Sequence, residues 1–226
     1  LALARACGLE AADSTIGVSG KRRYLLVKRY DRFADAQGEI RRLHQEDLCQ
    51  LTGHFPSQKY ERSTAGGGVT LKMMFDAISD LVSPAERSKL LDAVIFNVLI
   101  CNSDSHAKNY SILIGASGSA KLAPLYDLMC AAVYHQVDQS LPQGIAGRFT
   151  AADLQRADWQ ALADKAGLSG ASTLRRVDEL AELVSTACED VASQVAAIAG
   201  DPTRVVEKVT HSIQKRCRRI QARAKA

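Results

Sequence analysis

One long apolar segment, residues 84–101, constrains the fold of this chain more than any other feature. It has a clear helix start, because Ser83 suits the N-cap, Pro84 suits the first helical position and Glu86 completes a capping-box pattern. Apolar residues then occupy most of its faces: Leu90, Leu91, Val94, Ile95, Val98, Leu99 and Ile100. A helix that is apolar on most faces is buried. The segment therefore predicts a central helix that runs to about Cys101.

A polar loop and a hairpin follow this helix. The loop is residues 102–109, and the hairpin has strands at Tyr110–Ile114 and Lys121–Tyr126, joined by a turn of small residues. Asn109 precedes the first strand and Asp127 follows the second. Because neighbouring strands lie ~4.8 Å apart, we expect these two side chains to emerge side by side.

This arrangement gathers hard oxygen ligands, which suit Mg²⁺ rather than zinc. Asp104 lies five residues before Asn109, and D-x-x-x-x-N followed by a later Asp is the logic of a protein-kinase catalytic loop. Asp104 is then the base, and Asn109 and Asp127 hold the metal of bound Mg-ATP. The structural alternative is that the three residues only cap turns and a helix. Asn102-Ser103 stands where ordinary eukaryotic-type kinases have His-Arg, and Leu128-Met129 follows Asp127 where they have Phe-Gly.

Composition and charge exclude several protein classes. Hydrophobic residues at 46% and charged residues at 24% of the 226 residues exclude a fibrous, collagen-like or mostly disordered chain. The longest apolar stretch, residues 93–101, is far below the ~18 residues of a membrane span, and no signal peptide is visible. The six cysteines form no C-x-x-C pair, so we expect small buried hydrophobes in a reducing cytosol rather than zinc ligands.

The remaining pattern predicts an α+β fold that is mostly helical, with a short N-terminal strand pair and the hairpin. A polar loop runs from Asp31 to Glu39, and Thr150 and Asp201 are candidate N-caps. The expected strands are Ile16–Val18 and Tyr24–Tyr30, and the expected helices are Leu1–Cys7 (ended by Gly8), His44–Leu51, Leu71–Leu81, Ala151–Ala166, Ser172–Ala199 and Pro202–Ala224.

Five segments occur in an order that carries a family resemblance over about residues 1–135. They are Lys28–Arg32, Leu43–Gln50, Lys59–Glu61, Asn102–Ser111 and Leu122–Asp127. Together they resemble the successive motifs of the HipA-type serine/threonine kinases, which are bacterial toxins of toxin–antitoxin pairs linked to growth arrest and persistence. The segment Ser-Asp-Ser-His-Ala-Lys-Asn is the most specific of them.

The resemblance implies a protein-kinase-like C-terminal lobe and an ATP- and Mg²⁺-dependent kinase. Its substrate is a protein with a Ser or Thr acceptor, and its partner is a DNA-binding antitoxin. Asp104 is then catalytic, and Asn109 and Asp127 bind metal. The implied nucleotide-binding residues are Lys28, Arg29 and Tyr30 along the adenine, His106, Ala107, Lys108 and Asn109 at the phosphates, and Tyr126 and Asp127 beside the nucleotide. For His106 and Lys108 a solvated loop, and for the two tyrosines ordinary packing, are the structural alternatives.

The resemblance also implies a division of the chain. Residues 1–32 are the lobe-joining helix and strands, residues 33–149 the catalytic core and residues 150–226 a C-terminal helical bundle. The family's phosphate-covering loop and ATP-binding lysine precede the helix that Leu1–Cys7 represents. We therefore expect a C-terminal catalytic part without the N-terminal lobe, which alone binds ATP weakly and transfers phosphate slowly or not at all.

Two other functions remain open from the sequence. One is a small-molecule phosphotransferase, which an acidic pocket for a cationic acceptor would favour. The other is a non-catalytic kinase-like module that docks an antitoxin or DNA through the segment Arg204–Lys225, which has eight Lys or Arg and one acid. A solvated helix face explains that charge equally well. In each case we expect a cytoplasmic protein that does not contact a membrane.

Overall fold

The computed structural model of the chain describes residues 1–20, 22–64, 66–199 and 204–225. Its helices are α1 (Ala2–Ala6), α2 (Leu48–Leu51), α3 (Leu71–Ile78), α4 (Pro84–Leu99), α5 (Arg156–Lys165), α6 (Gly170–Ala199) and α7 (Arg204–Lys225). Short 3-10 turns are η1 (Pro56–Gln58), η2 (Ala107–Asn109), η3 (Ala131–Val133) and η4 (Ala151–Asp153). The strands are β1 (Ser14–Ser19), β2 (Arg22–Val27), β3 (Arg32–Ala34), β4 (Ile40–Arg42), β5 (His44–Asp47), β6 (Ser111–Ile114) and β7 (Ala120–Leu122).

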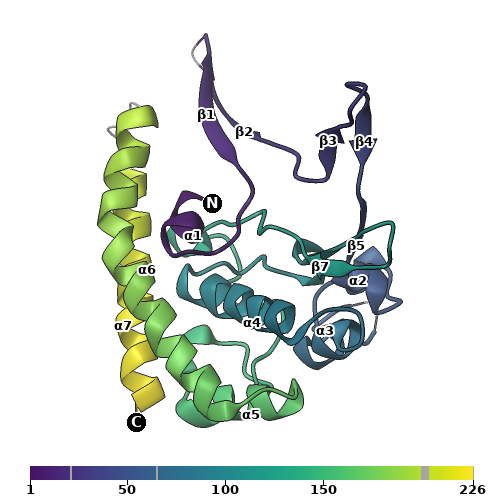
Figure 1. The fold of residues 1–226 in the computed structure, drawn as a ribbon. Helices are drawn as coiled ribbons and strands as arrows, with labels where there is room; N and C mark the ends of the chain where they lie inside the picture. The colour runs from purple at the N-terminus through teal and green to yellow at the C-terminus, as the bar shows by residue number, and fades with distance from the viewer. Residues whose placement is uncertain (21, 65, 200–203, 226) are drawn as a thin grey trace.

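The predicted central helix is α4, which lies in the middle of the molecule (Figure 1). The Ser83 hydroxyl accepts a hydrogen bond from the backbone N–H of Glu86, as expected of an N-cap. The Glu86 carboxylate does not complete a capping box. It accepts a hydrogen bond from the backbone N–H of Leu122 at 2.7 Å, so it links the start of the helix to β7.

The predicted hairpin is confirmed as β6–β7, but it belongs to a three-stranded antiparallel sheet in the order β5-β6-β7. The predicted helix His44–Leu51 is wrong in its first half, because His44–Asp47 pairs with β6 as a strand. Helix α2 begins only after Asp47, whose carboxylate accepts a hydrogen bond from the backbone N–H of Gln50 at 2.9 Å. The second hairpin strand is also shorter than predicted, since Leu125 leaves the hairpin and forms a bridge with Ala11.

Helices α6 and α7 lie side by side along one side of the molecule, and α5 crosses below α4 (Figure 1). The predicted helix Ala151–Ala166 is interrupted between η4 and α5, where the Asp158 carboxylate accepts a hydrogen bond from the backbone N–H of Gln155 at 2.8 Å. Thr150 makes no side-chain capping bond. The predicted N-cap Asp201 and helix start Pro202 lie outside the described residues.

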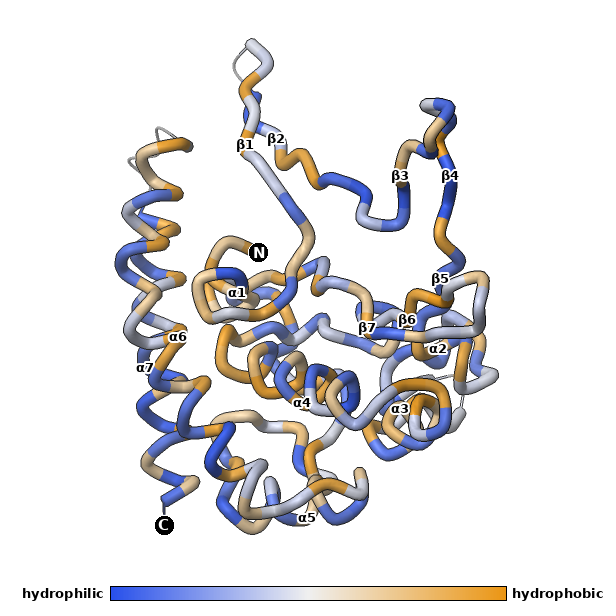
Figure 2. The backbone as a smooth tube through the Cα atoms, in the orientation of Figure 1, coloured by the Kyte–Doolittle hydropathy of each residue, from blue (hydrophilic) through white to orange (hydrophobic). Residues whose placement is uncertain are grey.

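Two hairpins, β1–β2 and β3–β4, project from the body on the same side as each other (Figure 1). The segment predicted as a polar loop to Glu39 therefore contains a strand pair. The buried Asp31 carboxylate anchors its start, since it accepts hydrogen bonds from Arg29 and Arg32. Both hairpins carry apolar side chains that are exposed (Figure 2). These side chains are Val18, Tyr24, Leu25, Leu26, Val27, Phe33 and Ile40.

The core lies between α4 and its neighbours and includes Phe75, Phe96 and Trp159. All six cysteines are free thiols; five are buried as expected, and Cys130 is half-buried. No helix in the described part of the chain is long and apolar enough to cross a membrane.

Candidate active site

The polar loop 102–109 leaves α4 through a tight C-terminal cap. Asn102 N–H bonds to the Asn97 carbonyl at 2.9 Å and Cys101 N–H to the Val98 carbonyl at 3.3 Å, which is the pattern of a Schellman motif. Cys101 takes the left-handed backbone conformation of that motif, with φ 59°. The cap turns the chain sharply, so that the loop runs back across the end of the sheet.

The Asn102 side chain connects three parts of the site. Its amide nitrogen donates to Asn97 Oδ1 at 2.8 Å and to the Asp127 carbonyl at 3.4 Å. Its amide oxygen accepts from the backbone N–H of Asp104 at 3.1 Å. This buried residue therefore joins α4, the polar loop and the segment after β7, a role that the sequence did not indicate.

Asp104 is the single acid of this loop, and 47% of its side chain is exposed. The Tyr60 hydroxyl donates a hydrogen bond to Asp104 Oδ1 at 2.5 Å. Asn109 Nδ2 donates to the Asp104 backbone carbonyl at 2.8 Å. The loop thus fixes a partly exposed carboxylate, and the Asn109 amide oxygen is the atom left to ligate a cation.

Asp127 is exposed and has a left-handed backbone conformation with φ 53°, which Asp tolerates better than most residues. Burial lowers the pKa of His106, and the negative charge of Asp127 opposes that shift only in small part. The closeness of Asn109 to Asp127 stays a prediction. The described residues contain no group of three or more His, Cys, Asp or Glu that could hold a metal ion.

An amide oxygen and a single carboxylate nevertheless suit a Mg²⁺ ion that is also bound by the phosphates of a nucleotide. Mg²⁺ commonly takes only one or two protein carboxylates and fills its other positions with water and phosphate oxygens. The donors that the sequence predicted, Asn109 and Asp127, are of this kind. They suit a metal that arrives with a nucleotide rather than a metal held by protein alone.

His106 is buried rather than solvated. Its ring packs edge-on against Tyr60 with centroids 5.1 Å apart, and its Nε2 is 3.9 Å from Asp104 Oδ1. Burial, and next the positive charge of Lys59, lower the pKa of His106. Ala107 is also buried, and its backbone N–H donates to the Lys59 carbonyl at 3.2 Å.

Lys108 contacts the sheet instead of open solvent. Its ammonium donates to Asp47 Oδ2 at 2.8 Å, and its carbonyl accepts from the Tyr126 hydroxyl at 2.6 Å. Asp47 caps α2 at the same time, so the ion pair attaches the polar loop to the α2 N-terminus. In this position the Lys108 ammonium would have to leave Asp47 to reach a phosphate.

Tyr30 and Tyr126, predicted to lie at the nucleotide, are brought together with ring centroids 6.0 Å apart. The Tyr126 hydroxyl lies 2.6 Å from Ser111 Oγ, which accepts from Gln45 Nε2 at 3.1 Å. Desolvation raises the pKa of Tyr30 to about 12 and raises the pKa of Tyr126 as well, so both hydroxyls stay protonated. These tyrosines form one wall between β2 and the sheet.

Lys28 and Arg29 lie on the connection between β2 and β3, and both side chains are exposed. Lys28 is attached through its backbone, because its N–H donates to the Asp13 carbonyl at 2.8 Å. Arg29 makes two hydrogen bonds to the Asp31 carboxylate, at 2.7 and 2.6 Å, which commits its guanidinium to the hairpin base. Of the three residues predicted along the adenine, Tyr30 is the one whose side chain packs near Tyr126 among the described residues.

A cavity of about 560 Å³ opens beside Asp104. It is lined mainly by apolar side chains, among them Met129, Val137 and Leu141, together with Arg62 and Asp138. Asp104 and Asp138 give the lining two carboxylates beside the one guanidinium of Arg62. The cavity gives the exposed side of the Asp104 carboxylate a neighbouring space in which an acceptor could lie.

Comparison with known proteins identifies relatives over nearly the whole chain. The model of the HipA-like C-terminal domain matches residues 1–195. The putative kinase Y4mE of Sinorhizobium fredii is 40% identical over 194 residues, which are 83% of this chain and 45% of that protein. The serine/threonine-protein kinase toxin HipA of Shewanella oneidensis is 28% identical over 96% of this chain and 52% of that protein. The chain thus spans about half the length of these relatives.

Solved structures show the same fold. HipA in the Shewanella oneidensis complex of HipA, HipB and operator DNA superposes with a TM-score of 0.88 at 24% identity, covering 99% of this chain and 55% of that one. The Helicobacter pylori proinflammatory kinase CtkA gives a TM-score of 0.62 at 14% identity, covering 99% of this chain and 80% of that one. With the family model matched over residues 1–195, the chain belongs to the family of HipA-like C-terminal domains.

Proposed function

We propose that this chain is the C-terminal catalytic part of an ATP- and Mg²⁺-dependent protein serine/threonine kinase, the toxin of a toxin–antitoxin pair. The observation that carries the proposal is the geometry around Asp104. Its carboxylate is partly exposed and held by Tyr60, while Asn109 is held on its carbonyl. The similarity to a putative kinase and to a kinase toxin supports the same reaction class.

In this proposal each residue has a separate task. Asp104 accepts the proton of the acceptor hydroxyl, and Tyr60 fixes the direction of its carboxylate. Asn109 Oδ1 and the Asp127 carboxylate hold Mg²⁺, which when bound neutralises charge on the phosphate oxygens. Tyr30 and Tyr126 form the nucleotide wall. Phosphoryl transfer needs positioning and charge neutralisation more than covalent chemistry, and these groups are of the types that supply both.

The division of the chain is part of the proposal: residues 1–32 join the lobes, residues 33–149 form the catalytic core and residues 150–226 form the helical bundle. The exposed apolar side chains of β1–β2 and β3–β4 support it, because a preceding lobe would cover them. Without that cover, we expect this chain alone to bind Mg-ATP weakly.

Calorimetric titration of the chain with Mg-ATP tests the proposal, together with saturation-transfer NMR for weak binding. We expect weak binding that is lost with EDTA and in Asp127→Ala. Asp164→Ala, an exposed aspartate change on α5, is the control and should bind like the unchanged chain. Absence of nucleotide binding in both methods, or equal binding by Asp127→Ala, contradicts the proposal.

A second candidate function is docking of an antitoxin or DNA on α7. Several of its basic residues are occupied within the chain: Arg219 and Arg223 lie 3.6 Å from Asp153, and Lys225 lies 3.1 Å from Asp178. The outward residues Lys208, His211, Lys215 and Arg218 recur at the three- and four-residue spacing of one helix face. The ion pairs of α7 in the described part of the chain involve Arg219, Arg223 and Lys225 and none of the four residues of this basic stripe.

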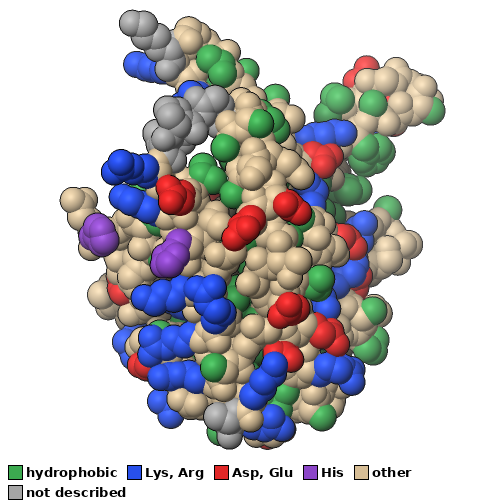
Figure 3. Space-filling view, turned by 90° about the vertical axis from the view of Figure 1, so that its left-hand side faces the viewer, with side chains coloured by type: hydrophobic (Ala, Val, Ile, Leu, Met, Phe, Trp, Pro, Cys, Tyr) green, Lys and Arg blue, Asp and Glu red, His purple; other side chains and the backbone are tan. Residues whose placement is uncertain are grey.

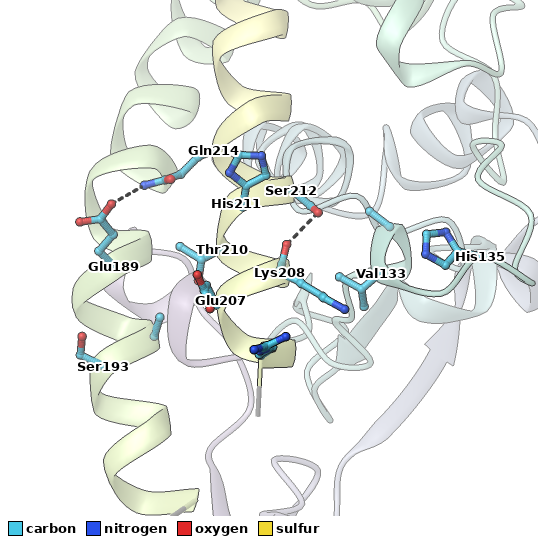
Figure 4. Close-up of a pocket in the computed structure, with 13 residues that line it drawn as sticks. Val133, His135, Glu189, Ser193, Glu207, Lys208, Thr210, His211, Ser212 and Gln214 are labelled. Carbon is cyan, nitrogen blue, oxygen red and sulfur yellow. Dashed lines mark hydrogen bonds between the residues drawn. The ribbon is translucent and has the colours of Figure 1, made fainter. Parts of the chain in front are cut away.

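Lys and Arg side chains gather on this side of the molecule, with histidines near them (Figure 3). One end of the basic stripe borders a hollow between α6, α7 and η3, where Lys208 and His135 come from different elements (Figure 4). The acids Glu189 and Glu207 line the same hollow, so the stripe rather than the hollow is the positive feature.

Fluorescence anisotropy with a short DNA duplex at several salt concentrations tests this second function. We expect the double variant Lys215→Ala/Arg218→Ala to reduce the slope of log affinity against log salt by roughly one per lost phosphate contact. Arg175→Ala, an exposed arginine on α6 that pairs with Glu179, is the matched control. No binding, or the same slope in all three proteins, removes direct DNA docking by α7.

A further inference from the structure

Two cysteines flank the candidate active site from opposite segments. Cys101 ends the α4 cap directly before the polar loop, and Cys130 follows Asp127 by three residues. The backbone N–H of Ala131 donates to the Cys101 carbonyl at 3.0 Å, so the segment that contains Cys130 lies against Cys101. The two cysteines are therefore neighbours in space although they are 29 positions apart in the sequence.

Cys101 occupies a backbone position that favours glycine. Its φ of 59° is left-handed, and most helices that end in this motif have glycine there because a side chain is strained. The side chain that this position carries places its sulfur 3.9 Å from the Ser212 carbonyl of α7, in the region where α4, α7 and the segment after Asp127 meet. Cys101 therefore combines a strained backbone conformation with a thiol that is held near α7.

The two thiols differ in access and acidity. Cys101 is buried, whereas Cys130 is half-buried at the N-terminus of η3. The interaction between the two thiols, and next burial, raise the pKa of Cys101. The same interaction lowers the pKa of Cys130 to about 7, with help from the Ala132 N–H and Arg216 and against the opposing effect of burial. A reachable thiol with thiolate character beside a second thiol is the arrangement in which a disulfide forms on oxidation.

We propose that Cys101 and Cys130 are an oxidisable pair, which a peroxide converts to a disulfide that ties the polar loop to the segment after Asp127. The Cys130 thiolate attacks one peroxide oxygen, the O–O bond breaks, and the other oxygen leaves as water after taking a proton. The Cys101 sulfur then displaces the oxygen of the Cys130 sulfenic acid as a second water. Two thiols and one peroxide give one disulfide and two waters.

The disulfide would alter the candidate active site because each cysteine lies within three residues of a residue of that site. An S–S bond of ~2.05 Å is much shorter than the contact of two hydrogen-bonded thiols, so it draws the two segments together. Asn102, adjacent to Cys101, already holds the Asp127 carbonyl. We therefore expect several-fold weaker Mg-ATP binding in the oxidised protein. This consequence rests on the proposed function, whereas the disulfide itself does not.

Mapping of the cross-link in the full chain tests the pair directly. The folded protein is treated with diamide, a thiol oxidant that becomes a hydrazine, then alkylated and digested with trypsin without reduction. Cleavage at Lys89, Lys108, Lys121 and Arg148 places Cys101 and Cys130 on separate peptides, residues 90–108 and 122–148. We expect these two peptides to be joined, with a mass lower by two hydrogens, and to separate with dithiothreitol.

Variants and a matched control complete the test. Cys130→Ser and Cys101→Ala should abolish the joined peptide, while Cys49→Ala, which changes a buried thiol on α2, should retain it. Separate alkylation of both cysteines in the oxidised unchanged protein, or a link from either one to Cys188 or Cys217, overturns the proposal. If the joined peptide forms but neither redox form binds Mg-ATP, the thiol pair stands and the proposed function fails.

Discussion

Tyr60 donates its hydroxyl to Asp104 Oδ1 at 2.5 Å, a contact between residues 44 positions apart. Burial, and next the bond to Asp104, raise the pKa of Tyr60, so the hydroxyl remains a donor. The bond occupies one carboxylate oxygen and leaves the other for an acceptor hydroxyl. In a kinase of this kind, Tyr60 is therefore a positioning residue for the base.

Tyr60→Phe is expected to lower kcat by roughly tenfold to a hundredfold, because it removes a hydrogen bond to a charged group worth about 1.5–3 kcal/mol. The melting temperature should change little, since Asp104 is 47% exposed and water can replace the hydroxyl. Steady-state phosphorylation of an acceptor peptide, measured on a longer protein that includes the proposed N-terminal lobe, and thermal melting of the chain check both expectations. Tyr134→Phe, an exposed tyrosine change, is the control, and an unaltered kcat in Tyr60→Phe refutes the positioning role.

Gly68 determines whether the Tyr60 segment can lie where it does. A Cβ added at Gly68 would meet the Tyr60 carbonyl oxygen at 1.7 Å, which is backbone and cannot rotate away. We expect Gly68→Ala to destabilise the fold by about 1–3 kcal/mol and to displace Tyr60 from Asp104. Urea unfolding measures the first effect.

Gly170→Ala provides the matched comparison for that change. Its added Cβ would meet only Gln160 atoms, at 3.7 Å or more, and alanine is a better helix former than glycine in α6. A Gly68→Ala protein as stable as Gly170→Ala would show that the close approach at Tyr60 does not constrain the fold.

Features set by neighbouring residues could be predicted from the sequence. The α4 start rests on Ser83 and Pro84, and the hairpin on the alternation around a small-residue turn; both appear where expected. His44–Asp47 was misassigned because its strand conformation depends on pairing with β6, which lies more than 60 residues later. The Glu86 side chain was misassigned for the same reason, since Leu122 offers its N–H only in the folded chain.

The same difference between local features and long-range contacts applies to the candidate site. Motif order predicts Asp104, Asn109 and Tyr126 as site residues, and the structure shows Asn109 bonded to Asp104 and Tyr126 bonded to Lys108. The roles of Tyr60 and Asn102 consist of contacts across 44 and 25 residues, so no local pattern could reveal them. The segment Lys59–Glu61 could be recognised in the sequence, but the hydrogen bond from Tyr60 to Asp104 could not.

The buried His106 predicts sensitivity to acid. Burial and Lys59 hold its pKa below the unfolded value of ~6.5, so at intermediate pH the unfolded chain binds a proton that the folded chain does not. Stability from this residue is complete above pH ~6.5 and declines as the pH falls towards the folded pKa. Thermal melts across this range should show a weaker decline for His106→Gln than for His135→Gln, an exposed control. Equal declines would contradict the assignment.

The Asp47–Lys108 ion pair predicts a measurable coupling between the polar loop and α2. The nitrogen–oxygen distance is 2.8 Å, and the two side chains are only 10% and 34% exposed, so water screens the pair less than a surface pair. We expect a double-mutant cycle with Asp47→Asn and Lys108→Met to give about 1–2 kcal/mol of coupling in urea unfolding. Asparagine keeps a capping oxygen for α2, so the cycle reports the charge rather than the cap.

The matched cycle uses Lys72 and Asp76, whose ion pair is shorter, at 2.5 Å, but whose side chains are 57% and 56% exposed. Its coupling should stay at or below ~0.5 kcal/mol. Similar couplings in both cycles would mean that burial does not strengthen the Asp47–Lys108 pair. Because the Lys108 carbonyl holds the Tyr126 hydroxyl, a strong coupling would also mean that the nucleotide wall depends on the α2 N-terminus. Lys108→Met should then weaken Mg-ATP binding.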